Sequence, residues 1–454
     1  MRPKPRRSLD PIEHRMELAL DPGTFIHDRA CFSFVSGLEE VSAKIGDLIA
    51  SDPARATVLY ETFLAGCGAK TEELDDSSGS FGQFAADLIC GWLKARQASG
   101  ADPDQTAATL LAWMDDDPYA FCYQIEKQAV KAFGRAGLAA FEKQVRTRFE
   151  AAAVAKPVPG KPLGDQPEYV RRHWSEVLRT IYLAQRNIPA YTALTAQTGL
   201  TAQDCHALAT LCVTRRQPDV ALAWVERGMQ LSSETPYEST ASYDLAKLQR
   251  ELLTRLGRSD EALELAWSEF QKHPGKYTYD DLMSMVPKGG RAAWHAKAMD
   301  AAQGADLDSL IELLIETKET QRLADLIRSA ADEALERISH YRSEPAAKKL
   351  EKAHPDLAAR LWRAQGMRIV DAKKSKYYDA ALSNFAHAKR CYERAGLAAE
   401  WEAAVQQVRA RHYRKTGFIS GFEAVAAGAR RDNQPSFLDR AKTSWSGRYR
   451  GSTY

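Results

Sequence analysis

Hydrophobic and small residues recur every three or four positions over long stretches of this chain, with polar residues between them. That spacing places them on one face of a helix. Gly396 marks a stop, because glycine readily adopts the left-handed conformation that ends helices, and another stripe follows it. The pattern predicts a helical hairpin whose two helices bury their stripes against each other and against a neighbouring pair. The first stripe is Tyr378, Ala381, Leu382, Phe385, Ala388 and Tyr392, and the second is Trp401, Val405 and Val408.

Similar hairpins recur in the second half of the chain. Asp219-Val-Ala-Leu and Asp260-Glu-Ala-Leu begin comparable stretches 41 residues apart, and residues 257–274 have the pattern of a tetratricopeptide second helix. No convincing series of alternating strands interrupts them. The sequence therefore predicts an all-α fold, an irregular α-solenoid of tetratricopeptide-like helical hairpins in two blocks.

The segment 155–168 separates the two blocks. It holds four prolines and two glycines, so it cannot continue a helix and is predicted to be a linker. The predicted parts are an N-terminal tail with a short helix (1–35), an N-terminal helical block (36–154), the linker (155–168), a tetratricopeptide-like repeat block (169–425) and a basic C-terminal tail (426–454). In the first two parts, helices are expected from the capping pair Asp10-Pro11 to Leu20 and from Gly37 to Ala50.

Charge is unevenly distributed along the chain. The net charge of the 454 residues is only +2, but residues 372–454 hold 16 Lys or Arg and 7 Asp or Glu. A basic end on an otherwise acidic protein can indicate a polyanionic partner. The alternative is a solvated helix surface beside a disordered tail.

The cysteines and the hydropathy pattern indicate a cytoplasmic protein. The seven cysteines are scattered without paired spacing, so a disulfide framework is not expected. No signal peptide is recognised, and no apolar run approaches the length of about 18 residues that a membrane span needs. No membrane partner is predicted.

Two clusters have the composition of metal sites but not the geometry. The turn from Asp75 to Gly79 lacks the glycine and glutamate positions of a calcium loop, so its oxygens are expected to cap the next helix. Cys205 and Cys212 share a helix face, but His206 points about 100° away from Cys205, and core packing is the preferred interpretation. No metal site is predicted.

Catalytic and cofactor motifs are absent from the sequence. Neither a Gly-x-x-x-x-Gly-Lys-Ser/Thr phosphate loop nor a Gly-x-Ser-x-Gly nucleophile elbow occurs. The sequence therefore predicts a protein that is not an enzyme and has no cofactor.

Several unusual stretches follow one another in a recognisable order. They are DDSSGSFGQFAADLIC, DPDQTAATLLAWMDDDPYAFCYQIEKQAVKAFGRAGLAAFEKQ, KKSKYYDAALSNFAHAKRCYERAGLAAEW and RHYRKTGF. In this order they resemble the helical region of bacterial SWIM-type zinc-finger proteins and their relatives without the finger, over most of residues 36–425. A SWIM finger binds zinc through Cys-x-Cys and Cys-x-His, and neither occurs here. The resemblance thus implies a helical-repeat body with a protein-binding or nucleic-acid-binding role, and no zinc site.

The predicted binding site lies on the hairpin between residues 373 and 415. An antiparallel hairpin brings the lysines before its first helix and the cations after its second helix to the same end, with two tyrosines among them. Lys389 and His412 fall on stripes that should be buried. The alternative for Lys389 is a stem whose amine reaches water, and for His412 a hydrogen bond to Tyr378 in the core. The candidate residues are Lys373, Lys374, Lys376, Tyr377, Lys389, Arg411, His412, Tyr413, Arg414 and Lys415.

These observations predict a scaffold that binds a protein partner. Stacked hairpins present many side chains over a long face, which suits proteins and peptides better than small molecules. The alternative is an accessory nucleic-acid-binding protein that acts through the basic C-terminal hairpin and tail.

Overall fold

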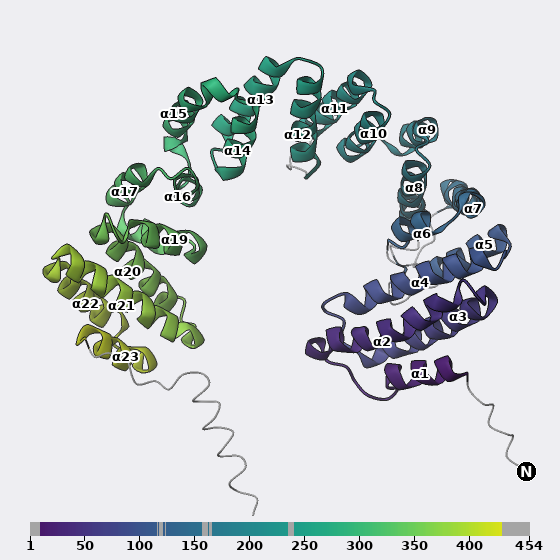
Figure 1. Ribbon diagram of the computed structural model, residues 1–454, viewed down its shortest axis with the longest axis horizontal. Helices are drawn as coiled ribbons and strands as arrows, with labels where there is room; N and C mark the ends of the chain where they lie inside the picture. Colours follow the sequence, from purple (N-terminus) through teal and green to yellow (C-terminus); the bar gives the residue numbers. More distant parts are fainter. Residues whose placement is uncertain are drawn as a thin grey trace, which may run out of the picture. The chain divides into compact units, whose positions relative to one another are not determined.

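The structure is a computed structural model that describes residues 10–428, except 116, 118–120, 123, 157–161, 163–165 and 235–239. Within these residues the chain forms 23 α-helices and no strand. It divides into two compact units, the first ending at Leu252 and the second beginning at Leu253, inside α12 (Thr240–Arg255). Each unit is an α-solenoid of successive helical hairpins, so the predicted all-α fold is confirmed (Figure 1).

In the first unit, helices that are close in sequence lie side by side. α1 packs against α2 and α3, and α4 packs against the same two helices from the other side (Figure 1). The helices are α1 (Pro11–Leu20), α2 (Asp28–Leu48), α3 (Pro53–Lys70), α4 (Ser80–Ala98), α5 (Pro103–Asp115), α6 (Glu126–Ala132), α7 (Arg135–Val154), α8 (Pro167–Ala184), α9 (Ile188–Thr198), α10 (Ala202–Thr214), α11 (Pro218–Ser233) and most of α12.

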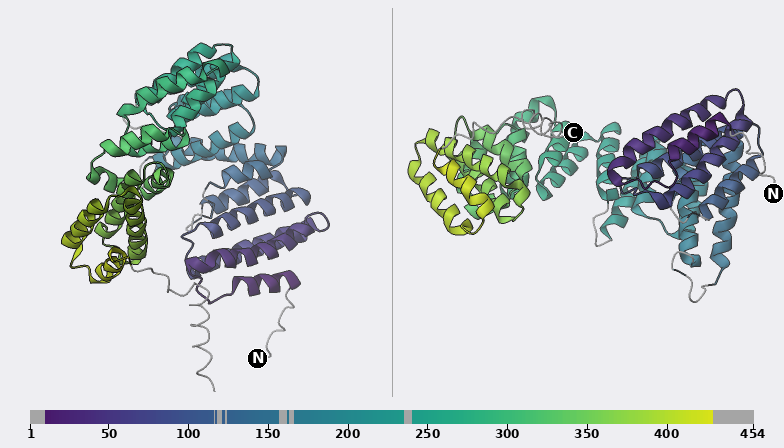
Figure 2. Two further views of the ribbon diagram at one scale, coloured as in Figure 1. Left: turned by 60° about the vertical axis from the view of Figure 1, so that its left-hand side comes forward. Right: turned by 90° about the horizontal axis from the view of Figure 1, so that it is seen from below.

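The second unit follows the same principle and ends in the hairpin that the sequence singled out. Its last four helices pack against one another, with α21 in contact with α20, α22 and α23 (Figure 2). The helices are α13 (Ser259–Lys272), α14 (Lys276–Met285), α15 (Arg291–Ala301), α16 (Leu307–Glu316), α17 (Thr320–Ser329), α18 (Asp332–Arg337), α19 (His340–Leu350), α20 (Pro355–Asp371), α21 (Tyr378–Ala395), α22 (Ala398–His412) and α23 (Thr416–Ala426).

Local signals set several helix ends as predicted. Asp10 forms a capping box with Glu13 at the start of α1, and Pro11 occupies the first helical position. Gly396, with φ of +73°, ends α21 in the left-handed conformation.

The start of α2 differs from the prediction. The helix expected from Gly37 begins at Asp28, inside the part that was predicted to be a tail with one short helix. Cys31 and Val35 of this early segment are buried in the core of the first unit. Their burial against neighbouring helices extends α2 by more than two turns beyond what its local pattern indicated.

The proline-rich segment 155–168 separates helices but not cores. Phe149 of α7 and Trp174 of α8 belong to one continuous hydrophobic core, and α7 packs directly against α8. The two compact units instead divide at Leu252, about 90 residues later. A segment that breaks a helix does not break a domain when the helices on both sides still pack together. Most of this segment, and residues 429–454 of the predicted tail, lie outside the described residues.

The two clusters with metal-like composition are structural. Asp76 accepts hydrogen bonds from the backbone N–H groups of Phe81 (3.0 Å) and Gly82 (2.8 Å), which caps α4 as predicted. Cys205 and Cys212 are buried in α10. No group of three or more metal-ligating side chains is found in the described part of the chain.

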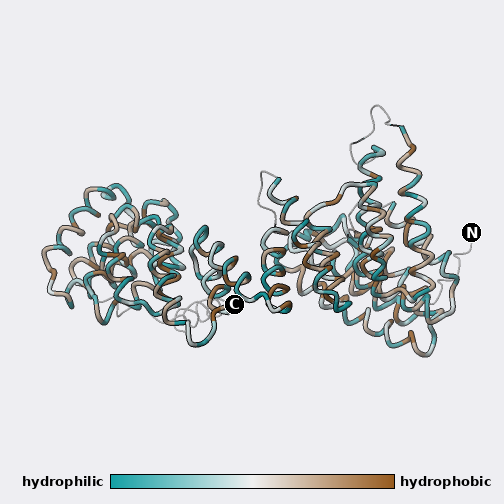
Figure 3. The backbone as a smooth tube through the Cα atoms, turned by 90° about the horizontal axis from the view of Figure 1, so that it is seen from above, coloured by the Kyte–Doolittle hydropathy of each residue, from teal (hydrophilic) through white to brown (hydrophobic). Residues whose placement is uncertain are grey.

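Hydrophobic and hydrophilic residues alternate along the individual helices (Figure 3). This amphipathic pattern lets each helix bury one side and expose the other. In the described ranges, no helix is both long enough and apolar enough to cross a lipid bilayer.

Candidate functional site

The predicted site lies where α20, α21, α22 and α23 pack together. Phe385 of α21 faces Gly366 of α20, where an added Cβ would lie only 2.7 Å from the Phe385 ring. Glycine thus permits the close approach of these two helices. Phe385 also meets Phe418 and Phe422 of α23, with ring centroids 6.0 and 4.9 Å away. This aromatic core fixes the ends of the four helices relative to one another.

α20 and α22 run in the same direction, because each is antiparallel to α21. Arg363 of α20 contacts Gln407 of α22, and these residues are 44 positions apart in the sequence. Toward the carboxyl ends of the two helices, Val370 contacts Lys415, and these residues are 45 positions apart. Nearly constant separations are the mark of parallel neighbours. The carboxyl ends of both helices therefore meet at one end of the second unit.

Seven of the ten predicted residues lie exposed at this carboxyl end, and the six of them other than Arg411 form what we call the basic end. Lys373 directly follows α20, and Arg414 follows α22. In the described part of the chain none of the four cations takes part in an ion pair. The Lys376 ammonium lies 4.9 Å from the ring centroid of Tyr377, and the Arg414 guanidinium lies 5.3 Å from that of Tyr413. The basic end consists of Lys373, Lys374, Lys376, Tyr377, Tyr413 and Arg414.

The position of the first lysines changes their interpretation. Lys373 and Lys374 come before the amino end of α21, where positive charge opposes the helix dipole. They also follow the carboxyl end of α20, where positive charge is favourable. Only Lys376, beside the amino end of α21, conflicts with the local helix dipole.

Arg411 and Lys415 bind other groups of the protein, although Arg411 is exposed. Arg411 forms ion pairs with Asp371 (2.8 Å) and Glu336 (3.4 Å), and the Lys415 ammonium donates a hydrogen bond to the carbonyl of Val370 (2.5 Å). Burial lowers the pKa of Lys415, and the nearby charges of Lys373 and Arg411 lower it further, although Asp371 opposes them. Both residues therefore join α22 and α23 to other helices.

Lys389 lies away from the basic end. Its ammonium donates hydrogen bonds to the carbonyl groups of Ala426 (3.0 Å) and Val425 (3.3 Å). These carbonyls lie at the end of α23, and that of Val425 also accepts a hydrogen bond from the Gly428 N–H (3.1 Å). Lys389 thus caps α23 from the side, which accounts for a cation on a stripe that is otherwise apolar.

His412 lies beneath the basic end and is only 2% exposed. Neither ring nitrogen has a hydrogen-bond partner among the described residues. Its Nε2 lies 3.5 Å from Oδ1 of Asp371, and its ring meets Phe418 edge-on, with centroids 6.2 Å apart. The alternative of a hydrogen bond to Tyr378 is therefore wrong, and Tyr378 packs on the same Phe418 ring.

We expect acidification to destabilise the second unit through His412. Burial lowers the pKa of His412, and Lys415 and Arg411 lower it further, while Asp371 raises it. The unfolded chain then binds a proton at a higher pH than the folded chain, so stability falls as the pH decreases below about 6.5. Thermal unfolding of the wild type and of His412→Gln at neutral and mildly acidic pH measures this. The variant should lose less stability on acidification, and an equal loss would contradict the assignment.

A groove between α20 and α22 was not predicted from the sequence. It has a volume of about 640 Å³, and Arg363 and Tyr392 lie in its wall. Its residues are spread from position 328 to position 407 on five helices and their connections. No local motif joins them, so sequence periodicity alone could not have grouped them.

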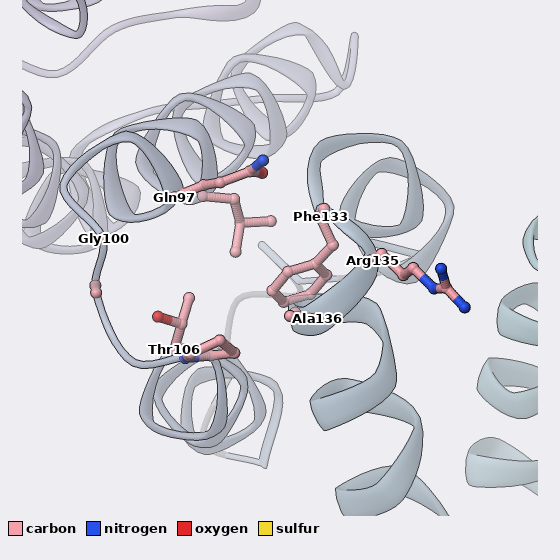
Figure 4. A pocket seen from close by; sticks show the side chains of 11 residues that line it. Gln97, Gly100, Thr106, Phe133, Arg135 and Ala136 are labelled. Carbon is pink, nitrogen blue, oxygen red and sulfur yellow. The ribbon is translucent and has the colours of Figure 1, made fainter.

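Another cavity of about 400 Å³ lies in the first unit, between α4, α5 and the start of α7. Figure 4 shows the Phe133 ring pointing into it, Gln97 and Thr106 beside it, and Arg135 directed away. The Thr106 hydroxyl is already bonded to the carbonyl of Asp102. Because the lining is mainly apolar and its one guanidinium points outward, we assign no chemistry to this cavity.

Comparison with known proteins identifies the family of this chain. No curated protein matches the chain. A chain in the structure titled "Structure of Naa15/Naa10 bound to HypK-THB" is 12% identical, with a TM-score of 0.34, and the match covers 95% of this chain and 70% of that one. At that TM-score the likeness carries no argument. A family of unknown function, DUF6880, matches residues 10–420, which include all the helices up to α22. This chain therefore belongs to the DUF6880 family.

Proposed function

We propose that this protein is a non-enzymatic helical-repeat scaffold that binds an acidic protein partner through the basic end. The supporting observation is the group of four cations, Lys373, Lys374, Lys376 and Arg414, beside two exposed tyrosines. Tyr377 is 48% exposed and Tyr413 is 60% exposed. Tyrosine and arginine are enriched at protein interfaces because they combine apolar contact with hydrogen bonding.

The extent of the basic end favours a protein over nucleic acid. Arg411 pairs with Asp371 and Lys415 binds the carbonyl of Val370, so four of the six expected cations remain without an ion-pair partner among the described residues. A small cluster of charges complements an acidic segment of a protein. A nucleic-acid site usually continues as a basic stripe along the phosphate backbone.

Reversal of three of these charges tests the proposal. Lys373→Glu, Lys374→Glu and Lys376→Glu together should weaken binding of a fluorescein-labelled Glu/Ser peptide by about 10- to 100-fold, measured by fluorescence anisotropy. The matched control reverses Lys288, Lys349 and Lys352, which are exposed elsewhere in the second unit. It changes the net charge equally and should bind like the wild type. Equal weakening in both variants would show a non-specific charge effect and contradict the proposal.

The second candidate is nucleic-acid binding at the same place, favoured by the exposed tyrosine rings on which bases could stack. With about four phosphate contacts, the logarithm of the affinity should fall with the logarithm of salt concentration at a slope of about −3 to −4. A labelled DNA or RNA oligonucleotide in the same assay measures this slope. Absence of binding at low salt excludes this candidate and leaves the acidic protein.

Two finer points belong to the proposal. The seven cysteines are free thiols, which supports a reducing compartment such as the cytoplasm.

The proposed relation to SWIM-type proteins that lack the finger rests on the sequence stretches named above. It predicts that the isolated protein contains no stoichiometric zinc, which metal analysis measures.

A further inference from the structure

The groove between α20 and α22 has two matching walls. Asp356, Leu357, Arg360 and Arg363 line it from α20, and Glu400, Ala403, Ala404 and Gln407 line it from α22. In both helices the spacing spans seven residues, which corresponds to about 10 Å of helix. The opening therefore has the length of a short extended peptide segment rather than that of a single small group.

Arg360 and Arg363 of the groove form ion pairs and hydrogen bonds with other residues of the protein. Arg363 donates a hydrogen bond to Oε1 of Gln407 (2.9 Å) and forms an ion pair with Asp332. Arg360 also binds Asp332 and donates to the carbonyl of Ala330 (2.7 Å) at the end of α17. Burial alone would raise the pKa of Asp332, but these two arginines hold it below its usual value. The Asp332 carboxylate therefore balances one of the two positive charges, and neutral carbonyl and amide oxygens accept the other hydrogen bonds of the two guanidinium groups.

Two donors in the groove wall have no hydrogen-bond partner among the described residues. Tyr392 is 5% exposed as a whole, but its hydroxyl oxygen is open to the groove. Arg363 is 7% exposed, and its Nε is fully buried. Because buried polar groups in folded proteins are nearly always hydrogen-bonded, the unpaired Nε of Arg363 beside the open Tyr392 hydroxyl points to a ligand with hydrogen-bond acceptors. The Gln407 amide nitrogen, next to the Arg363 contact, adds a third donor.

The groove holds two further carboxylates, those of Asp356 and Glu400. Asp356 and Glu400 form no ion pair with any residue that the structure describes. Each lies seven positions before one member of the Arg363–Gln407 contact, so in parallel helices they lie at the same level on opposite walls. Each also lies in the first turn of its helix, where the dipole stabilises it. The helix dipole accounts for the position of each of these two carboxylates. It does not account for the unpaired Tyr392 hydroxyl in the same groove.

We propose that this groove binds an extended peptide of a partner protein, with a Lys or Arg side chain between Asp356 and Glu400. A main-chain carbonyl of the peptide accepts a hydrogen bond from the Tyr392 hydroxyl. An adjacent apolar side chain packs on Leu357 and Leu397. Main-chain hydrogen bonds then supply affinity, and the two carboxylates select a basic residue. This site is separate from the basic end and has the opposite charge preference.

Selection of random peptides displayed on phage, with the full chain as target, tests this assignment. Clones that bind the chain but not the Asp356→Asn, Glu400→Gln double variant should carry Lys or Arg beside an apolar residue. A synthetic peptide from such a clone should bind the double variant about 10-fold more weakly, as measured by anisotropy. Tyr392→Phe, which removes only the hydroxyl, should weaken it about 3- to 10-fold. Unchanged thermal unfolding of these variants shows that they remain folded.

Glu402→Gln is the matched control. This residue lies on α22 two positions from Glu400 but not in the groove, so its neutralisation should leave peptide binding unchanged. Selected peptides that are acidic, or that bind the double variant as well as the wild type, would overturn the proposal. Binding that occurs only in a chain ending at Gly428 would also overturn it, because residues 429–454 of the chain itself would then occupy the groove. This test of the groove is independent of the test of the basic end, because the basic end is probed with the acidic Glu/Ser peptide.

Discussion

Replacement of Asp204 with alanine should lower the free energy of unfolding of the first unit by about 3–5 kcal/mol. Asp204 is 2% exposed, and its Oδ1 accepts hydrogen bonds from Nε of Arg179 and from the Tyr191 hydroxyl, both at 2.7 Å. Burial alone would raise the pKa of Asp204, but these two partners hold it below its usual value, so the carboxylate is charged. The substitution leaves the Arg179 guanidinium, only 8% exposed, without its counter-charge. Chemical denaturation followed by circular dichroism measures the loss.

Two further variants separate this ion pair from a general effect of substitution. Glu226→Ala, on the exposed side of α11, should change stability by no more than about 0.5 kcal/mol. Arg179→Met combined with Asp204→Leu should cost less than Asp204→Ala, because both charges are removed together. A loss below about 1 kcal/mol for Asp204→Ala would show that Arg179 finds other partners, such as Ser175 and Thr198, that suffice.

Trp401→Ala should destabilise the second unit by about 3–5 kcal/mol. The Trp401 side chain is 7% exposed and packs between Tyr392 and Phe422, with ring centroids 6.2 and 6.4 Å away. Its removal leaves a cavity where α21, α22 and α23 meet, and the aromatic neighbours can close it only in part. Thermal or chemical unfolding of the purified chain measures the effect.

Tyr413→Ala serves as the comparison for Trp401→Ala, because Tyr413 lies at the end of the same helix but is 60% exposed. Its loss should change stability by about 0.5 kcal/mol or less. Similar effects of the two substitutions would mean that Trp401 does not hold the hairpin to α23.

The candidate site was predictable only where local patterns specify it. The stripes of the hairpin, the left-handed Gly396 and the meeting of cations at one end all follow from helix periodicity and antiparallel packing. The neutralisation of Arg411 does not, since its partner Glu336 lies 75 residues earlier. Likewise, Lys389 was a candidate binding residue, with an amine that reaches water as the alternative, whereas it caps α23, which begins 27 residues later.

Local sequence patterns specify the helical hairpins, helix ends such as Gly396 and the apolar stripes that the helices bury. These features depend on interactions between residues at most six positions apart, such as the Asp10 capping box and the Asp76 cap of α4. Long-range packing determines where one compact unit ends, which charges remain without ion-pair partners, and that Asp356 and Glu400 share a groove. Those outcomes depend on how helices far apart in the chain align, and many alignments bury the same apolar stripes equally well. Side-chain pairs across helices then follow from the alignment adopted, because a single ion pair is too weak to select it.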